Sequence, residues 1–167
     1  MAAPRRHDKA GISPRQHGPG TTHLTPTRNA ICRTGGERLR RGMTSLILVM
    51  LGGALGSGAR YLTGRATLSL LGPDYPYGTL TVNLLGGLLM GLLVGVLARI
   101  TTAEPWRLFV GVGVLGGFTT FSSFALDAVT LAEGGAPFAA LGYVLLSVTG
   151  AIAALAAGLF IARSVAA

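Results

Sequence analysis

From residue 43 onward, apolar residues run in long stretches without charge, separated by short segments that hold Arg, Asp, Glu or Pro. Each stretch is close to the roughly 20 residues that an α-helix needs to cross the hydrocarbon core of a bilayer. The pattern therefore predicts an all-α membrane protein with four transmembrane helices. The predicted spans are Gly42–Ala59, Tyr75–Ala98, Leu108–Leu126 and Gly134–Ala162.

The composition agrees with this class of protein. Half of the 167 residues are hydrophobic, 12% are charged and 26 are glycine, as is typical of a small polytopic membrane protein. The formal net charge is +8, but residues 1–42 hold nine of the 14 basic residues. Because the basic excess is confined to this leader, it does not indicate a nucleic-acid partner. The single cysteine excludes an intrachain disulfide.

Residues 1–42 show no apolar periodicity, which predicts a disordered basic leader. They do not match a secretory signal, in which a short basic stretch directly precedes an apolar run. A further interpretation follows from Met43, which stands immediately before the first apolar run. On that interpretation the start codon is assigned too early, and the functional chain is the four-helix transmembrane domain 43–167. Both interpretations of the leader stay open.

The basic residues near the span ends decide the expected orientation. Arg99, Arg107 and Arg163 fall on the side of the termini, and Arg60 and Arg65 on the opposite side. Without the leader this bias is nearly nil, so the chain could insert in both orientations and form an antiparallel homodimer. With the leader, nine basic groups hold the termini in the cytoplasm.

Glycines recur at a spacing of four in three of the predicted spans, which lines small residues along one helix face. Such faces let helix backbones approach closely. Packing within one subunit and packing between subunits are equally compatible with the pattern. The glycines concerned are Gly52 and Gly56; Gly87, Gly91 and Gly95; and Gly113 and Gly117.

The third predicted span contains a segment that does not suit a helix facing lipid. Residues 116–124 combine a helix-breaking glycine pair, four hydroxyl groups and three phenyl rings. Irregular backbone at membrane depth is tolerated only where protein, an ion or a water-filled path satisfies its polar groups. The segment therefore predicts a broken third helix and a candidate site.

Further polar and aromatic groups lie at the same depth. Thr79 and Asn83 are four residues apart on one helix face, and so are Tyr143 and Ser147. These groups form a line of hydrogen-bond donors without a buried acid or base for proton or redox chemistry. An asparagine in this position also suits a simple bridge between helices. The aromatic pair Phe121 and Phe124 is likewise compatible with core packing.

Three motifs resemble those of the fluoride channel family, Fluc or CrcB. They are Gly52-Gly53-Ala54-Leu55-Gly56 leading to Arg60-Tyr61, then Gly78-Thr79-Leu80-Thr81-Val82-Asn83, then residues 116–124. The resemblance covers essentially all of residues 43–167, with the motifs in the same order and spans. It implies a dual-topology, antiparallel homodimer with two fluoride pores and a central, structural sodium ion held by backbone carbonyls.

The resemblance also implies roles for individual residues. Phe121 and Phe124 match the phenyl pair that lines the pore, and Asn83 matches a donor that faces the anion. The carbonyls of Gly116 and Thr119 match those that hold sodium. The remaining matches are Arg60 at the end of the first helix, Asp127 in place of a more usual Glu near a pore mouth, and Tyr143 and Ser147 in the polar track of the fourth helix. Ala151 departs from the family, in which a hydroxyl residue is common at this position.

The sequence therefore predicts a channel that lets fluoride leave passively across the plasma membrane, in which the chain is a multi-pass protein. A small four-helix multidrug exporter of dual topology is the alternative, but it would need a buried carboxylate in its first span, and Gly42–Ala59 has none. A purely structural membrane protein would leave the polar line unexplained. An enzyme is not expected, because the predicted bundle lacks His, Cys, Lys and a buried acid pair.

Overall fold

The structure, a computed structural model, describes residues 28–101 and 103–165, with side chains from residue 39 onward. Residues 1–27 of the predicted leader lie outside the described residues. The chain divides into the units Met1–Gly36 and Glu37–Ala167, and the following account concerns the second. The elements in chain order are α1 (Arg28–Leu71), α2 (Tyr77–Leu97), α3 (Glu104–Trp106), the π-helix η1 (Arg107–Leu115), α4 (Gly116–Phe118), α5 (Phe121–Glu133) and α6 (Pro137–Val165).

Four helical segments in the described part of the chain are long and apolar enough to cross a membrane. They are Leu39–Leu71, Tyr77–Leu97, Glu104–Glu133 and Pro137–Val165. The predicted all-α architecture with four spans is therefore confirmed. The third span is a composite of α3, η1, α4 and α5, and it is interrupted between α4 and α5 as the sequence predicts.

The first helix is longer than the first predicted span. It begins at Arg28, so residues 28–42, which the sequence predicts to be disordered, are helical in the structure. It also continues past Arg60 and Arg65 and ends at Leu71, before Gly72, whose φ of 83° is a left-handed conformation that favours glycine. A charge-free run measures the thickness of the hydrocarbon core, whereas the helix ends only where the backbone finds a terminating residue.

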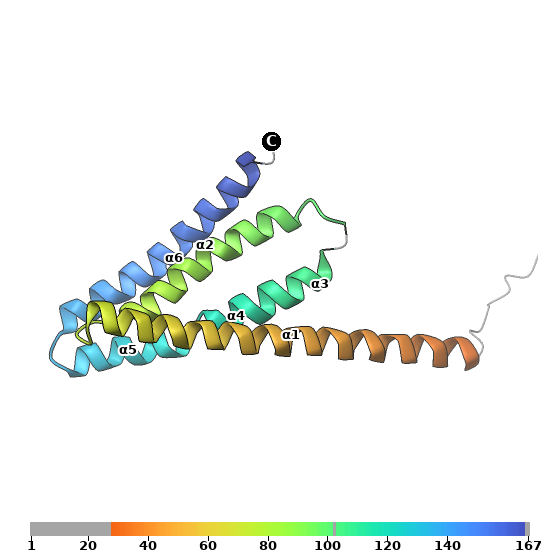
Figure 1. Cartoon of the computed structure of the whole chain (residues 1–167), viewed down its shortest axis with the longest axis horizontal. Coiled ribbons are helices and arrows are strands. Elements are labelled where there is room, and N and C mark those ends of the chain that lie inside the picture. Colours follow the sequence, from red (N-terminus) through yellow and green to blue (C-terminus); the bar gives the residue numbers. More distant parts are fainter. Residues whose placement is uncertain (1–27, 102, 166–167) are drawn as a thin grey trace, which may run out of the picture. The chain divides into compact units, whose positions relative to one another are not determined.

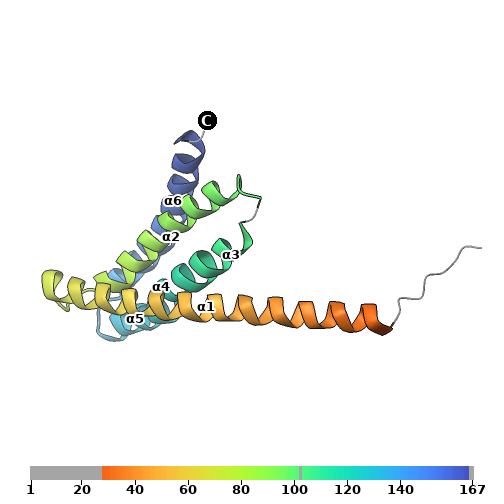
Figure 2. The ribbon, with the colours of Figure 1, turned by 45° about the vertical axis from the view of Figure 1, so that its right-hand side comes forward.

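The glycine pattern is explained by packing within the chain. Helices α2 and α6 lie side by side (Figure 1 and Figure 2), and a Cβ atom added to Gly87 would lie 2.7 Å from the carbonyl oxygen of Ala151. Helix α1 packs in the same way on η1, where a Cβ atom on Gly113 would lie 2.9 Å from the Cα atom of Gly52. Such close backbone contact is available only to glycine.

Candidate functional site

The interruption of the third span lies at two threonines. Thr119 (φ −80°, ψ 157°) and Thr120 (φ −151°, ψ 122°) are extended, whereas Gly116 and Gly117 belong to helix α4. The sequence-based expectation that the glycine pair itself breaks the helix was wrong. Gly117 instead allows α4 to pack closely on α1, because a Cβ atom there would lie 2.7 Å from the carbonyl oxygen of Gly53. The β-branched threonines suit the extended backbone that follows.

Asn83 of α2 is paired with the extended segment. Its Oδ1 accepts a hydrogen bond from the backbone N–H of Thr120 at 2.9 Å, and its Nδ2 donates to the carbonyl oxygen of Thr120 at 3.1 Å. Asn83 therefore bridges two helices, which is one of its two predicted roles. A side-chain amide has two N–H donors, so one remains after this pairing.

The interruption leaves two backbone carbonyls without their usual helical partners. In an unbroken α-helix the N–H of Thr120 would bond the carbonyl of Gly116, and the N–H of Ser123 that of Thr119. Here the Thr120 N–H donates to Asn83, and the Ser123 N–H donates to the Thr120 Oγ1 at 3.2 Å. These carbonyls belong to the two residues predicted to hold sodium. No cluster of three or more His, Cys, Asp or Glu side chains occurs in the described residues.

Four of the predicted pathway residues line one cavity of about 390 Å³, here called the phenyl cavity. They are Asn83, Phe121, Phe124 and Ser147. The rings of Phe121 and Phe124 lie 5.3 Å apart and are tilted by 46°. The hydroxyl of Ser147 is buried and makes no hydrogen bond to any described residue. Ala151, the predicted departure from the family, also lines this cavity.

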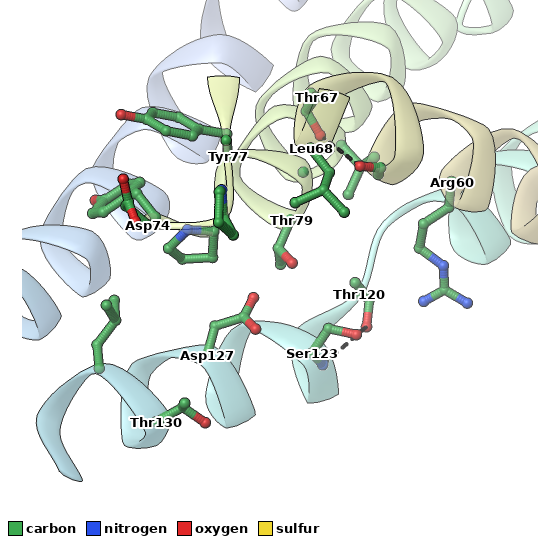
Figure 3. A pocket seen from close by; sticks show the side chains of 18 residues that line it. Arg60, Thr67, Leu68, Asp74, Tyr77, Thr79, Thr120, Ser123, Asp127 and Thr130 are labelled. Carbon is green, nitrogen blue, oxygen red and sulfur yellow. Dashed lines mark hydrogen bonds between the residues drawn. The ribbon is translucent and has the colours of Figure 1, made fainter. Parts of the chain in front are cut away.

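Three other predicted residues, Arg60, Thr79 and Asp127, line a second cavity of about 400 Å³, here called the polar cavity. Figure 3 shows the side chains of Thr79 and Asp127 pointing into it from α2 and α5. Thr79 and Asn83 are thus assigned to different cavities despite sharing a predicted helix face. Tyr75 lines the polar cavity outside the spans, and burial, with a contribution from Tyr77, raises the pKa of its phenol above the usual 10.0. Its hydroxyl remains protonated at neutral pH.

Tyr143 connects the residues of the two cavities. Its side chain is fully buried, and its hydroxyl donates to Asp127 Oδ2 at 3.2 Å. Its ring lies 5.4 Å from that of Phe124 and meets the ring of Tyr75 edge-on at 5.7 Å. Thr120 lines both cavities. The role of Thr120 was not predicted, although the Thr-Thr pair after the two glycines marks the position.

Comparison with known proteins decides which family the chain belongs to. Residues 47–159 match the family model described as CrcB-like protein, Camphor Resistance (CrcB). The chain belongs to the CrcB-like family. Three relatives are each named fluoride-specific ion channel FluC, and each match covers 97–98% of the relative. The relative from Mesorhizobium japonicum is 52% identical over 73% of this chain, that from Sphingopyxis alaskensis 54% over 72%, and that from Caulobacter vibrioides 53% over 74%.

Membership in the CrcB-like family and the four apolar helices assign this chain to the plasma membrane as a multi-pass protein. The family match includes all eight predicted pathway residues and both residues predicted to hold sodium. Arg60 is the first of these residues along the chain and Ser147 the last.

Proposed function

We propose that this CrcB-like protein is a fluoride-selective channel through which fluoride leaves the cell passively across the plasma membrane. The observation that carries the proposal is the identity of 52–54% to relatives named for this function, over nearly their whole length. The chain is a channel and not an enzyme. The exporter alternative has no support, since the first span, Leu39–Leu71, holds no acidic residue.

The phenyl cavity has the chemistry that a dehydrated anion needs. Fluoride is small and strongly hydrated, so a pathway must replace its water with hydrogen-bond donors. The second amide N–H of Asn83 and the unpartnered hydroxyl of Ser147 are donors of this kind. The positive ring edges of Phe121 and Phe124 provide further contact for an anion in a passage with little water.

The polar cavity provides the hydrated end of the pathway. Thr79 and Tyr75 offer hydroxyl groups, and Arg60 offers a cation that attracts an anion to the entrance. Tyr143 connects the two ends, and its hydroxyl is the donor that fluoride meets between them. Asp127 accepts the hydrogen bond of Tyr143, which fixes that hydroxyl until the anion arrives.

Sodium fits the interruption of the third span. A hard monovalent cation suits carbonyl oxygens at a broken helix, and the carbonyls of Gly116 and Thr119 lack the helical partners that an unbroken helix would give them. Sodium bound there neutralises these dipoles and has a structural role. If so, exchanging sodium for choline during purification lowers the thermal stability of the protein, and an unchanged melting temperature contradicts the site.

A second copy of the chain completes the assembly as an antiparallel homodimer. Phe121 is 78% exposed in the single chain, so its ring has room for a contact from a partner subunit. The mass of the purified protein in detergent tests the dimer. Labelling of a single cysteine, introduced after Cys32→Ser, from each side of sealed vesicles tests the dual topology, since one orientation alone would expose it on one side only.

Reconstituted liposomes test the function directly. Vesicles loaded with potassium fluoride and containing the protein release fluoride to an external electrode when an ionophore balances the charge. The same vesicles loaded with potassium chloride retain their chloride. Absence of fluoride efflux, or equal efflux of both anions, would overturn the proposal.

A further inference from the structure

A third cavity, of about 420 Å³, lies between α1 and the start of the third span, and the proposed fluoride pathway does not use it. Helix α1 contributes Arg40 and Arg41 to this arginine cavity, followed by Thr44 and Ser45. The third span contributes Glu104 from its first turn. The cavity thus collects two cations, two hydroxyls and one carboxylate.

The cavity changes from charged to apolar with depth in the membrane. Leu48 also lines it, one helical turn beyond Thr44, and Leu108 lines it one turn beyond Glu104. Because α1 and the third span are the first and third of four spans, both enter the membrane from the same side. The arginine cavity therefore has a charged mouth and an apolar floor.

The two segments close together below this floor. A Cβ atom on Gly113 would lie 3.1 Å from the carbonyl oxygen of Val49, and one on Gly52 would lie 2.9 Å from the Cα atom of Gly113. These backbone contacts are too close to admit another molecule. An occupant therefore enters from the mouth or from the lipid side, and it does not pass through.

The hydroxyls at the mouth are already engaged as donors. Thr44 Oγ1 donates to the carbonyl of Arg40 at 3.0 Å, and Ser45 Oγ donates to that of Arg41 at 2.9 Å. The donors left for a ligand are the two guanidinium groups, and both arginines are exposed. Guanidinium groups bind phosphate oxygens through paired N–H donors.

We infer that the arginine cavity binds an anionic phospholipid of the phosphatidylglycerol type. Arg40 and Arg41 hold its phosphodiester, a headgroup hydroxyl donates to Glu104, and an acyl chain covers Leu48 and Leu108. The apolar floor distinguishes a lipid from free phosphate, which has nothing to bury there. Basic groups next to a membrane helix are the usual binding partners of anionic headgroups.

This inference does not rest on the proposed function. Arg40 and Arg41 precede residue 47, where the family match begins, so the site belongs to this chain and is not a subsite of the family's pathway. Loss of lipid binding and loss of fluoride efflux are therefore separate results, and neither implies the other.

Trp106, the only tryptophan of the chain, is exposed and comes directly after Pro105, which lines the cavity, so its fluorescence reports a lipid bound there. The full chain in neutral detergent is titrated with brominated phosphatidylglycerol or brominated phosphatidylcholine, and quenching of Trp106 is measured. Two basic residues, each contributing about 1 kcal/mol, predict about 30-fold tighter binding of the anionic lipid. Equal quenching by both lipids would overturn the inference.

Variants separate this site from general charge effects. Arg40→Gln with Arg41→Gln reduces binding of phosphatidylglycerol to the level of phosphatidylcholine. Arg65→Gln with Arg163→Gln removes the same charge elsewhere and leaves binding unchanged. An unchanged affinity in the first double variant contradicts the site.

Two further experiments identify the ligand. Glu104→Ala removes the preference for phosphatidylglycerol over phosphatidylmethanol, a phosphodiester lipid of the same charge that has no headgroup hydroxyl for that carboxylate. If that preference persists in Glu104→Ala, the assigned contact is wrong. Inorganic phosphate at millimolar concentration leaves the quenching unchanged, whereas displacement by phosphate would show a site for the free anion and overturn the lipid.

Discussion

Asn83 and Thr120, 37 positions apart in the chain, exchange two hydrogen bonds at the interruption of the third span. One amide side chain thus replaces the helical partners that the extended backbone has lost. Unsatisfied backbone groups are costly at membrane depth, so this pair keeps the irregular segment in place. It also removes from Gly116 the N–H that would otherwise cover its carbonyl.

Replacement of Asn83 by alanine is expected to affect both stability and transport. The buried N–H and carbonyl of Thr120 lose their partner, which lowers the free energy of unfolding by about 1–3 kcal/mol. Fluoride efflux slows because the phenyl cavity loses its amide donor. Thermal unfolding in detergent and the electrode assay measure the two effects. Thr120→Val keeps the backbone groups that Asn83 binds but removes the Oγ1 that caps α5, so it measures the contribution of that cap separately. Unchanged stability in Asn83→Ala would contradict the role of the pair.

The two phenylalanines are expected to respond differently to isoleucine. Phe124 is 8% exposed and packs on Tyr143, so Phe124→Ile lowers thermal stability. Phe121 is 78% exposed, so Phe121→Ile leaves the fold intact and slows fluoride efflux by about tenfold through loss of the ring edge. Efflux at the parent rate in Phe121→Ile would remove this ring from the pathway.

Ser147 offers a test in which stability and transport move in opposite directions. Its buried hydroxyl has no partner among the described residues, so Ser147→Ala raises the free energy of unfolding by about 1 kcal/mol. The same change removes a donor from the phenyl cavity and slows efflux. Thr149→Val on the same helix is the control, because Thr149 is exposed and bonds its own helix. A higher free energy of unfolding together with an unchanged efflux rate would mean that fluoride does not contact Ser147.

The hydroxyl of Tyr143 is expected to act through Asp127. Tyr143→Phe keeps the buried ring and removes the hydrogen bond, which costs about 1.5–3 kcal/mol when the acceptor is a carboxylate. In a double-mutant cycle with Asp127→Asn, efflux in the double variant falls no further than in the more affected single variant. Additive effects on efflux would show that the two side chains act independently.

Close packing of α1 on η1 is expected to tolerate no added methyl group. Gly113→Ala places a Cβ atom 2.9 Å from the Cα atom of Gly52 and lowers the free energy of unfolding by about 2 kcal/mol. Gly58→Ala is the control, because nothing lies within 4 Å of a Cβ atom there. Its stability is unchanged or higher, since alanine favours the helix. Equal melting temperatures for the two variants would contradict the contact.

The sequence alone determined the number and type of the spans and indicated the segment in which the third span is interrupted. Four charge-free runs gave the four apolar helices because the thickness of the bilayer fixes the length of a span. The composition of residues 116–124 indicated the interruption, and the spacing of the glycines indicated close packing. The motifs gave the family, which the comparisons confirmed. The residues assigned to sodium and to the fluoride pathway stay predictions.

Only the tertiary structure decided where the third helix breaks and what holds it there. Gly117 remains in helix α4, where α1 leaves no space for a side chain, and the extended Thr120 is held by its two hydrogen bonds to Asn83. The structure also divided the polar line between two cavities and buried Tyr143 in contact with Asp127 of one cavity and Phe124 of the other. These features depend on contacts between distant segments, and a periodic pattern along one helix does not contain them.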